Sequence, residues 1–291
     1  MEHKSGFVNI IGKPNVGKST LMNALVGEKL SIITPKAQTT RHRILGIVNS
    51  DDFQIVFSDT PGIVKPHYEL HKSMMKFVET ALEDADIILF VTEVNEKELE
   101  PETIERIQNS TIPVIALLNK IDQCEQDVAM QKLTELQALL PKATCIPVSA
   151  LHNFNLESVL TKILELLPES PPYYPKDELT DRSTRFFVSE IIREKILLLY
   201  KQEIPYSVQV VIESFVEEPK ITRIAATIHV ARDTQKSIII GKGGIAIKRL
   251  GTDARKDMET FLGQKVFLEL FVKVTKDWRD DERSLRHFGY E

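Results

Sequence analysis

A glycine- and lysine-rich loop near the start of the chain has the composition of a phosphate-binding site. The stretch GKPNVGKST follows the strand candidate FVNII at 7–11, and from Gly12 to Ser19 it fits the G-x-x-x-x-G-K-[ST] spacing. Glycines let backbone N–H groups fold around an anion, and the following helix N-terminus adds partial positive charge. Lys18 is expected to reach the β- and γ-phosphates and Ser19 to bind Mg²⁺. The nucleotide-binding residues predicted here are Gly12, Lys13, Pro14, Asn15, Val16, Gly17, Lys18 and Ser19.

Three later segments indicate which nucleotide binds. In DTPG, Asp59 can hold the magnesium shell, and Gly62 lets its N–H approach a γ-phosphate. In NKID, Asn119 supplies an amide and Asp122 a carboxylate, which would accept from the N1–H and amine of guanine but be repelled by the N1 lone pair of adenine. In SAL, the N–H of Ala150 could donate to the guanine O6. The residues predicted in these segments are Asp59, Thr60, Pro61, Gly62, Ile63, Asn119, Lys120, Ile121, Asp122, Ser149, Ala150 and Leu151.

These segments follow strand candidates in a chain that alternates strands and helices up to about residue 168. Because several strand candidates are continuously apolar, they indicate a mostly parallel sheet buried on both faces. The prediction is a doubly wound α/β domain over 1–168, with the ligand at the carboxyl ends of its strands. Four prolines in PESPPYYPKDE predict a linker over 169–180. Beyond it, a helix, two strands, a glycine loop, a helix and a strand predict a small α+β domain over 181–280, followed by a tail over 281–291.

A second glycine loop, GKGG at 241–244, belongs to this small domain. It lacks the spacing and the hydroxyl of the first loop, and its G-x-x-G pattern resembles the loop with which KH domains clamp about four single-stranded nucleotides. The order of elements is similar to the type 2 KH arrangement. The isoleucines at 238, 239, 240, 245 and 247 are expected to wall a groove, and nearby cations to contact phosphate. The predicted RNA-binding residues are Lys236, Gly241, Lys242, Gly243, Gly244, Lys248 and Arg249.

Taken together, the motifs GKPNVGKST, QTTRHR, DTPG, NKID, SAL and GKGG resemble the Era family of bacterial ribosome-assembly GTPases. The resemblance implies a Mg²⁺-dependent GTPase whose switches are 31–43 and 62–72. It also implies that Ser19, Thr40 and Asp59 form the metal shell, and that Lys18, Thr40 and Gly62 are catalytic. Ile63 stands where Ras-like GTPases have a water-orienting glutamine, so intrinsic hydrolysis should be slow. Asn15 matches an asparagine that binds K⁺ in some relatives; its alternative role is to stabilise the loop.

The same resemblance implies the partners: the 3′ region of small-subunit rRNA and the maturing 30S particle, bound by a monomer. It implies a cytoplasmic location with peripheral association at the inner membrane. The net charge of −5 argues against strong electrostatic membrane binding, and the sequence shows neither a signal peptide nor an apolar run long enough to span a membrane. Cys124 and Cys145 are expected to be reduced structural thiols. Arg41 and Arg43 are expected to be solvated surface charges, with a role as switch-region cations as the alternative.

Two other functions remain open at this stage. The first is a GTP-regulated assembly factor whose main partner is a protein, with the C-terminal domain as its docking module. It predicts partner binding that is insensitive to salt. The second is a metabolic P-loop enzyme such as a nucleotide kinase, which leaves NKID, SAL and the KH-like domain unexplained.

Overall fold

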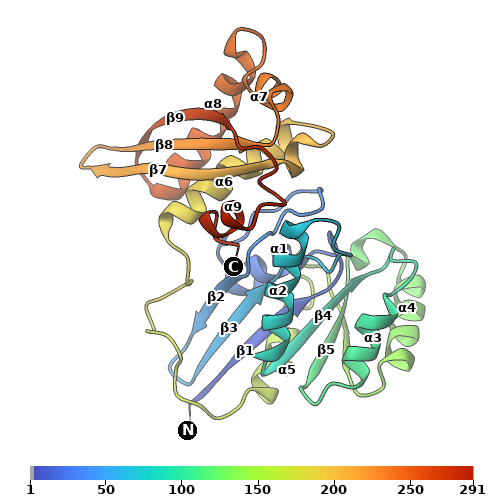
Figure 1. The fold of residues 1–291 in the computed structure, drawn as a ribbon. Coiled ribbons are helices and arrows are strands. Elements are labelled where there is room, and N and C mark those ends of the chain that lie inside the picture. Colours follow the sequence, from blue (N-terminus) through green and yellow to red (C-terminus); the bar gives the residue numbers. More distant parts are fainter. Residues whose placement is uncertain (1–2, 291) are drawn as a thin grey trace. The chain divides into compact units, whose positions relative to one another are not determined.

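The computed structural model describes residues 3–290, which divide into two compact units (Figure 1). The first unit contains the residues up to Ser31, Thr40–Lys65 and Met74–Asp181. The second contains Ile32–Thr39, Pro66–Ser73 and the residues from Arg182 onward. Two short segments of the N-terminal half of the sequence are therefore part of the C-terminal unit. Ile32–Thr39 falls within the first predicted switch, 31–43, and Pro66–Ser73 overlaps the second, 62–72.

The first unit is built on a six-stranded sheet with the strand order β2-β3-β1-β4-β5-β6. All neighbouring strands are parallel except β2 and β3. The strands are β1 (Lys4–Ile11), β2 (Ile44–Asn49), β3 (Phe53–Asp59), β4 (Ile87–Glu93), β5 (Val114–Asn119) and β6 (Thr144–Pro147). The helices are α1 (Lys18–Val26), α2 (Glu69–Glu83), α3 (Pro101–Gln108), α4 (Gln126–Leu139) and α5 (Leu156–Leu166). The predicted doubly wound fold is confirmed.

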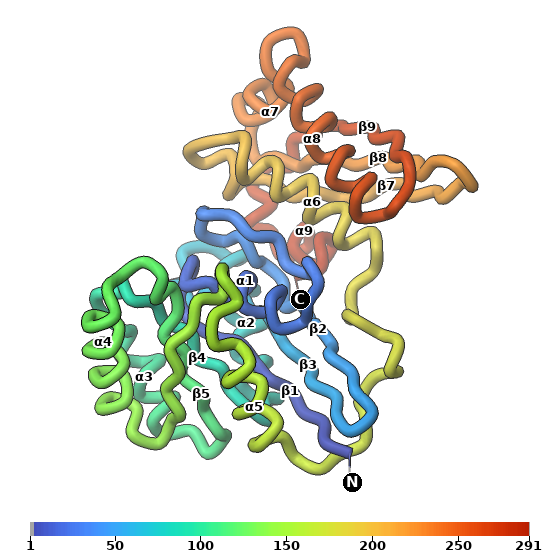
Figure 2. The backbone as a smooth tube through the Cα atoms, turned by 180° about the vertical axis from the view of Figure 1, so that it is seen from behind, coloured from blue at the N-terminus to red at the C-terminus, as the bar shows by residue number. Residues whose placement is uncertain are grey.

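Continuous burial of the central strands explains why their sequences do not alternate. Every residue of β5 is buried, as are the first six of β4, because helices cover the sheet. On one face, Phe90 and Leu118 pack with Ile104 of α3 and Leu136 of α4. Figure 2 shows the unit from behind, with α5 in front of the strands. This packing fixes the carboxyl ends of β1, β3, β5 and β6, from which the predicted nucleotide motifs project.

The proline-rich segment after α5 runs along the edge strand β2. The N–H of Ile47 donates to the carbonyl of Leu179 at 2.9 Å, and the N–H of Leu45 donates to Asp181 Oδ1 at 3.0 Å. Nearby, Gln54 Nε2 donates to the carbonyl of Tyr174 at 2.8 Å. The segment expected as a linker is thus hydrogen-bonded to the first unit, and it covers a strand edge that would otherwise be open.

The second unit contains a three-stranded sheet, order β7-β8-β9, in which β7 and β8 are antiparallel and β8 and β9 parallel. Its core joins Val188 and Ile192 of α6 to Leu250 and Met258 of α8 and to the inner face of the sheet. The two helices that flank the GKGG loop are α7 and α8. The elements are α6 (Thr184–Leu199), β7 (Val208–Glu218), β8 (Ile221–Val230), α7 (Asp233–Ile240), α8 (Ile245–Leu262), β9 (Lys265–Val274) and α9 (Glu282–His287).

The C-terminal segment, expected to be a charged tail, packs onto this unit. Trp278 is fully buried, and its Nε1–H donates to the carbonyl of Ser207 at 3.0 Å. Tyr290 is 2% exposed, and its hydroxyl donates to Gln209 Oε1 at 2.8 Å. The charged residues face solvent while the aromatic residues supply a second apolar layer. Within residues 3–290, none of the helices combines the length and apolar character needed to cross a membrane.

Candidate nucleotide and RNA sites

The phosphate-binding loop connects β1 to α1 through a backbone that depends on glycine. Gly12 and Gly17 have φ angles of 150° and 101°, and Asn15 adopts the left-handed region at 66°. A Cβ at Gly12 would lie 2.2 Å from the carbonyl oxygen of Val91, and one at Gly17 would lie 2.3 Å from Asn119 Nδ2. Any side chain at these positions would displace the loop, so the spacing predicted from the sequence is enforced by close packing.

Lys18 lies at the first turn of α1 and is buried beneath the loop. Its ammonium group donates to the carbonyls of Gly12 at 3.0 Å and Lys13 at 2.8 Å. Burial lowers the pKa of Lys18 to about 8, although the negative charge of Asp59 partly opposes the shift. The ammonium group is therefore poorly solvated, and phosphate oxygens placed beside it would favour its charged form.

Three oxygen-bearing side chains meet beside Lys18. Asp59 Oδ2 accepts from Ser19 Oγ at 2.7 Å and from Thr40 Oγ1 at 3.2 Å, and the two hydroxyls are 2.9 Å apart. Asp59 is fully buried, and its Oδ1 has no hydrogen-bond partner among the residues that the structure describes. Burial raises the pKa of Asp59, while the hydrogen bond from Ser19 opposes the shift. An all-oxygen set with a buried, unsatisfied carboxylate oxygen fits a hard divalent cation such as Mg²⁺.

The DTPG segment returns to the phosphate loop. The N–H of Ile63 donates to the carbonyl of Gly12 at 3.1 Å, and Thr60 Oγ1 donates to the carbonyl of Ile10 at 2.7 Å. A Cβ at Gly62 would lie 2.7 Å from Pro14, so the backbone comes as close to the loop here as glycine allows. The backbone of Gly62 therefore lies against the loop, and its role as a γ-phosphate ligand stays a prediction.

Asn119 braces the site. It is 2% exposed; its Nδ2 donates to the carbonyl of Val16 at 2.8 Å, and its Oδ1 accepts from the N–H of Ala150 at 3.0 Å. The residue therefore ties the phosphate loop to the SAL segment. The sequence predicted only a base contact for Asn119, and the bracing role went unrecognised because it depends on backbone groups far away in the chain.

Asp122 lies nearby with its carboxylate partly exposed. Its Oδ1 accepts from Ser149 Oγ at 2.5 Å, which orients the group, and Lys120 Nζ donates to the carbonyl of Asn15 at 2.6 Å and pairs with Glu93. Leu151 is 70% exposed beside them. NKID and SAL are thus brought together at the carboxyl ends of β5 and β6, with the Asp122 carboxylate partly exposed. The N–H of Ala150, predicted to donate to a base, instead donates to Asn119 Oδ1 at 3.0 Å in this structure.

The GKGG loop of the second unit also has a glycine-dependent backbone. Gly241, Gly243 and Gly244 have positive φ angles of 72°, 61° and 75°. A Cβ at Gly241 would lie 2.6 Å from the Cβ of Ala246, whereas those at Gly243 and Gly244 would meet nothing within 4 Å. Gly243 and Gly244 therefore leave open space where a phosphate can approach the backbone. Lys242, Lys248 and Arg249 are exposed around the loop, and Lys236 is half-buried on α7.

One part of the predicted groove is wrong. Ile239 is fully buried in the core of the unit, whereas Ile238 and Ile245 are 50% and 73% exposed. Consecutive residues of a helix face different directions, so an apolar run cannot all line one wall. Ile238 and Ile245 remain available to a ligand, and Ile239 only anchors the loop.

The expectation that Arg41 and Arg43 are solvated surface charges is also wrong: Arg41 is 1% exposed, and Arg43 pairs with Asp84 at 2.5 Å.

Comparison with known proteins decides the family. The model of the 50S ribosome-binding GTPase family matches residues 7–120, and that of the KH domain matches residues 203–279. A crystal structure of Era in complex with MgGDPNP and nucleotides 1506–1542 of 16S ribosomal RNA is 41% identical to this chain, covering 99% of both chains with a TM-score of 0.94. The chain belongs to the Era family. A variant of Aquifex aeolicus Era bound to GDP and AlF4⁻ is also 41% identical over 99% of both chains, with a TM-score of 0.93.

Era-family membership confirms the predicted order of a GTPase domain followed by a KH domain, and with it the predicted GTPase activity. A nucleotide kinase is excluded, because the likeness to Era covers both domains. The individual residues predicted as ligands are placed together by the structure, as described above, and their roles remain predictions.

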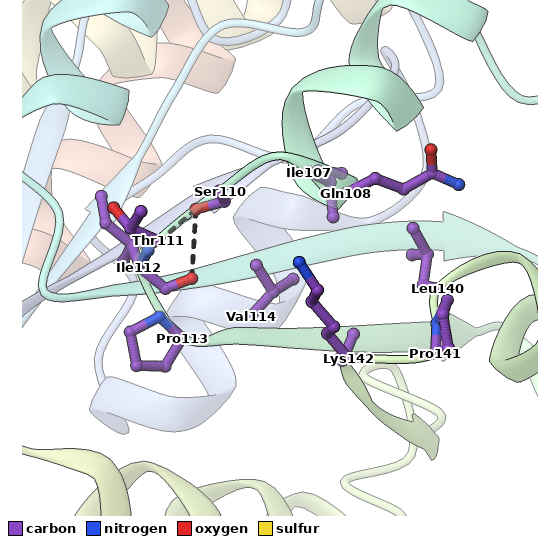
Figure 3. A pocket seen from close by; sticks show the side chains of 11 residues that line it. Ile107, Gln108, Ser110, Thr111, Ile112, Pro113, Val114, Leu140, Pro141 and Lys142 are labelled. Atoms are coloured by element: carbon purple, nitrogen blue, oxygen red, sulfur yellow. Dashed lines mark hydrogen bonds between the residues drawn. The ribbon is translucent and has the colours of Figure 1, made fainter.

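A separate cavity of about 360 Å³ lies away from the nucleotide motifs (Figure 3). It is lined by Ser110–Val114 and Leu140–Ala143, the connections that lead into β5 and β6. Ser110 Oγ donates to the carbonyl of Ile112 at 3.1 Å and accepts from its N–H at 3.0 Å. Because these connections are at the amino ends of the strands, the cavity is at the edge of the sheet opposite the nucleotide motifs.

Proposed function

We propose that this protein is a GTP-controlled RNA-binding switch that binds the 3′ region of small-subunit 16S rRNA and assists 30S assembly and rRNA maturation. The observation that carries the proposal is the likeness over the full chain to Era in complex with a GTP analogue and the 3′-terminal nucleotides of 16S rRNA. The exposed glycine loop and its surrounding cations support the RNA part. Cations placed on phosphates make binding depend on salt.

In the nucleotide site, Lys18 would neutralise β- and γ-phosphate oxygens, and the loop amides would hold them in place. Ser19, Thr40 and Asp59 are the residues that would hold Mg²⁺; when bound, the ion neutralises charge on the phosphate oxygens. Thr40 and Gly62 would order the switches around the γ-phosphate. Ile63 has no group that could orient the attacking water, so the intrinsic rate of hydrolysis should be slow and open to acceleration by a partner.

A potassium ion is the candidate for the missing catalytic charge. Asn15 is exposed on the phosphate loop, and its backbone adopts the left-handed region. If it binds K⁺, replacing KCl by NaCl at constant ionic strength should slow hydrolysis, and Asn15→Ala should remove the difference between the two salts. An equal rate in both salts would assign Asn15 to loop stability alone.

We place the protein in the cytoplasm as a monomer that meets the 30S subunit, with weak peripheral association at the inner membrane. The net charge of −5 limits any general attraction to anionic lipids. Membrane contact would therefore be transient, and the ribosomal particle the main partner.

The proposal is tested by measuring phosphate release from GTP with an RNA strand carrying the 3′-terminal sequence of 16S rRNA, and with a scrambled strand of equal length. We expect the 3′-terminal strand to accelerate hydrolysis and the scrambled strand to have little effect. Lys18→Ala should be inactive with both strands. A rate that neither strand changes, with no binding of either, would instead favour a protein as the main partner.

A further inference from the structure

The N-terminal part of the first predicted switch, Ile32–Thr39, belongs to the same compact unit as the KH domain. The end of this segment contacts Arg193 of α6, which is 1% exposed. Arg193 Nη1 donates to the carbonyl of Gln38 at 3.3 Å, and Nη2 donates to the carbonyl of Thr39. One buried guanidinium therefore holds two successive carbonyls of the switch.

Glu190, one helical turn earlier in α6, fixes the position of Arg193. Its Oε1 accepts from Arg193 Nε at 2.7 Å, and its Oε2 accepts from Nη2. Burial by itself would lower the pKa of Arg193, but the charge of Glu190 and its hydrogen bonds raise it, so the guanidinium stays charged. A planar fork that is held on one side by a carboxylate has few other orientations available.

Further contacts tie the same segment to α6. The ammonium group of Lys36 donates to the carbonyls of Leu197 and Tyr200, at the C-terminal end of the helix, where a cation is favoured by the helix dipole. Thr39 Oγ1 donates to the carbonyl of Lys36 at 2.6 Å and closes the turn between them. The switch segment is thus held at both ends of its last four residues.

The backbone conformation of Gln38 indicates that these contacts have a functional role. Its φ angle is 58°, in the left-handed region that a residue other than glycine rarely adopts. Its side chain also bonds to the second switch segment, with Nε2 2.8 Å from His71 Nε2 and Oε1 accepting from the Tyr68 hydroxyl at 3.2 Å. Such strained backbone persists only where surrounding contacts determine it, and it is concentrated at switches.

The carbonyl of Thr39 belongs to the peptide bond that precedes Thr40. Because that peptide is planar, fixing the carbonyl also fixes the N–H of Thr40 and the direction in which the chain continues. Thr40 here has its hydroxyl on Ser19 and Asp59, the arrangement expected when a switch threonine joins the metal ligands. The contact with Arg193 is therefore one peptide away from the proposed γ-phosphate sensor.

We propose that Arg193, anchored by Glu190, is a positioning residue that holds the Thr39–Thr40 peptide so that Thr40 faces the metal site in the GTP state. The KH-domain helix α6 thereby favours GTP over GDP. The inference rests on the proposed role of Thr40. Since coupling is reciprocal, a ligand that changes α6 would change GTP affinity, and GTP would change the affinity for that ligand by the same factor.

The test compares the affinities for a fluorescent non-hydrolysable GTP analogue and for fluorescent GDP. In the double variant Glu190→Gln/Arg193→Gln, two amides replace the ion pair, so no lone charge is left buried. We expect about a tenfold loss of GTP-analogue affinity, as for one charge-assisted hydrogen bond, with GDP affinity unchanged. Arg193→Lys keeps a charge beside Glu190 but cannot reach both carbonyls, and should show the same selective loss if the double variant does not fold.

Lys195→Gln is the matched control, because Lys195 is also on α6 but pairs with Glu194 and Asp257. Within residues 3–290, Lys195 makes no hydrogen bond to the switch segment Ile32–Thr39. It should leave the ratio of the two affinities unchanged. Thr40→Val tests the proposed role of Thr40 independently of Arg193. If Thr40→Val lowers GTP-analogue affinity and the Arg193 variants do not, this inference is wrong while the role of Thr40 stands. If Thr40→Val also has no effect, both fail. An equal loss for both nucleotides in the Arg193 variants would mean that the pair is only structural.

Discussion

Replacing Asn119 with alanine would remove both hydrogen bonds that connect the phosphate loop to the SAL segment. The carbonyl of Val16 and the N–H of Ala150 would lose their partners, and both residues are at most 3% exposed. A buried group left without its hydrogen bond costs about 1–3 kcal/mol. With partial access of water to a loop at the surface, we expect the free energy of unfolding of the nucleotide-free protein to fall by about 2–4 kcal/mol.

Nucleotide affinity should fall as well, by more than the loss of a base contact alone explains. The loop amides bind phosphate only when the loop is held in shape, so part of the binding energy would be spent on ordering it. We expect a loss of about 100-fold in GDP affinity, equivalent to about 2.7 kcal/mol. Asn119→Asp should be similarly weakened, because a carboxylate can accept from Ala150 but would face the carbonyl of Val16.

The assays are urea unfolding followed by circular dichroism and GDP binding followed by calorimetry. Asn95→Ala is the matched control, since Asn95 is an exposed asparagine of the same unit that donates to Gln123 at 3.0 Å. It should change stability by less than about 0.5 kcal/mol. The bracing role is refuted if Asn119→Ala unfolds like the wild type in urea and loses only nucleotide affinity, because that pattern means a contact with the base and nothing more.

Further predictions concern protonation, base choice and the KH core. Burial lowers the pKa of Lys18 to about 8, and bound phosphate favours the charged form of its side chain. Nucleotide binding above pH 8 should therefore take up a proton, and the nucleotide affinity should fall as the pH rises. Calorimetry in two buffers of different ionisation enthalpy measures this proton uptake, and Lys18→Gln should abolish it. Asp122→Asn should shift preference from guanosine to xanthosine nucleotides in competition binding, and an unchanged preference would refute the assignment of the base contact. Trp278→Ala should cost about 3–5 kcal/mol of the stability of the second unit by differential scanning calorimetry, since it empties a fully buried site; a loss below 1 kcal/mol would show that the C-terminal segment does not belong to the core.

The nucleotide motifs could be predicted from the sequence because their chemistry is local. From Gly12 to Ser19, each residue type is dictated by a backbone turn or a phosphate contact within a single loop, and strand–loop–helix periodicity supplied the context. The mostly parallel sheet could also be predicted, because continuous apolar runs identify strands that are covered on both faces.

What could not be predicted depends on partners far apart in the chain. Asn119 bonds to Val16, 103 residues away, and Arg193 to Gln38, 155 residues away. Pairs of residues this far apart cannot be predicted from the spacing of residues along the chain. For α6, however, a signal was present: Glu190 and Arg193 are three residues apart, among apolar residues that repeat with helical period, and a charged pair buried in this way must be satisfied by further partners.

If RNA binding is coupled to the bound nucleotide, the affinity for RNA must differ between the GDP state and the GTP state. A short single-stranded RNA from the 3′ end of 16S rRNA is titrated at two salt concentrations, with GDP and with a non-hydrolysable GTP analogue, against the wild type, Lys242→Asp and the control Lys220→Asp, an exposed lysine outside the loop. We expect tighter binding with the GTP analogue, weaker binding at higher salt, and loss of binding in Lys242→Asp only. Equal RNA affinity in both nucleotide states would contradict the switch, and no affinity in either state would contradict the RNA partner.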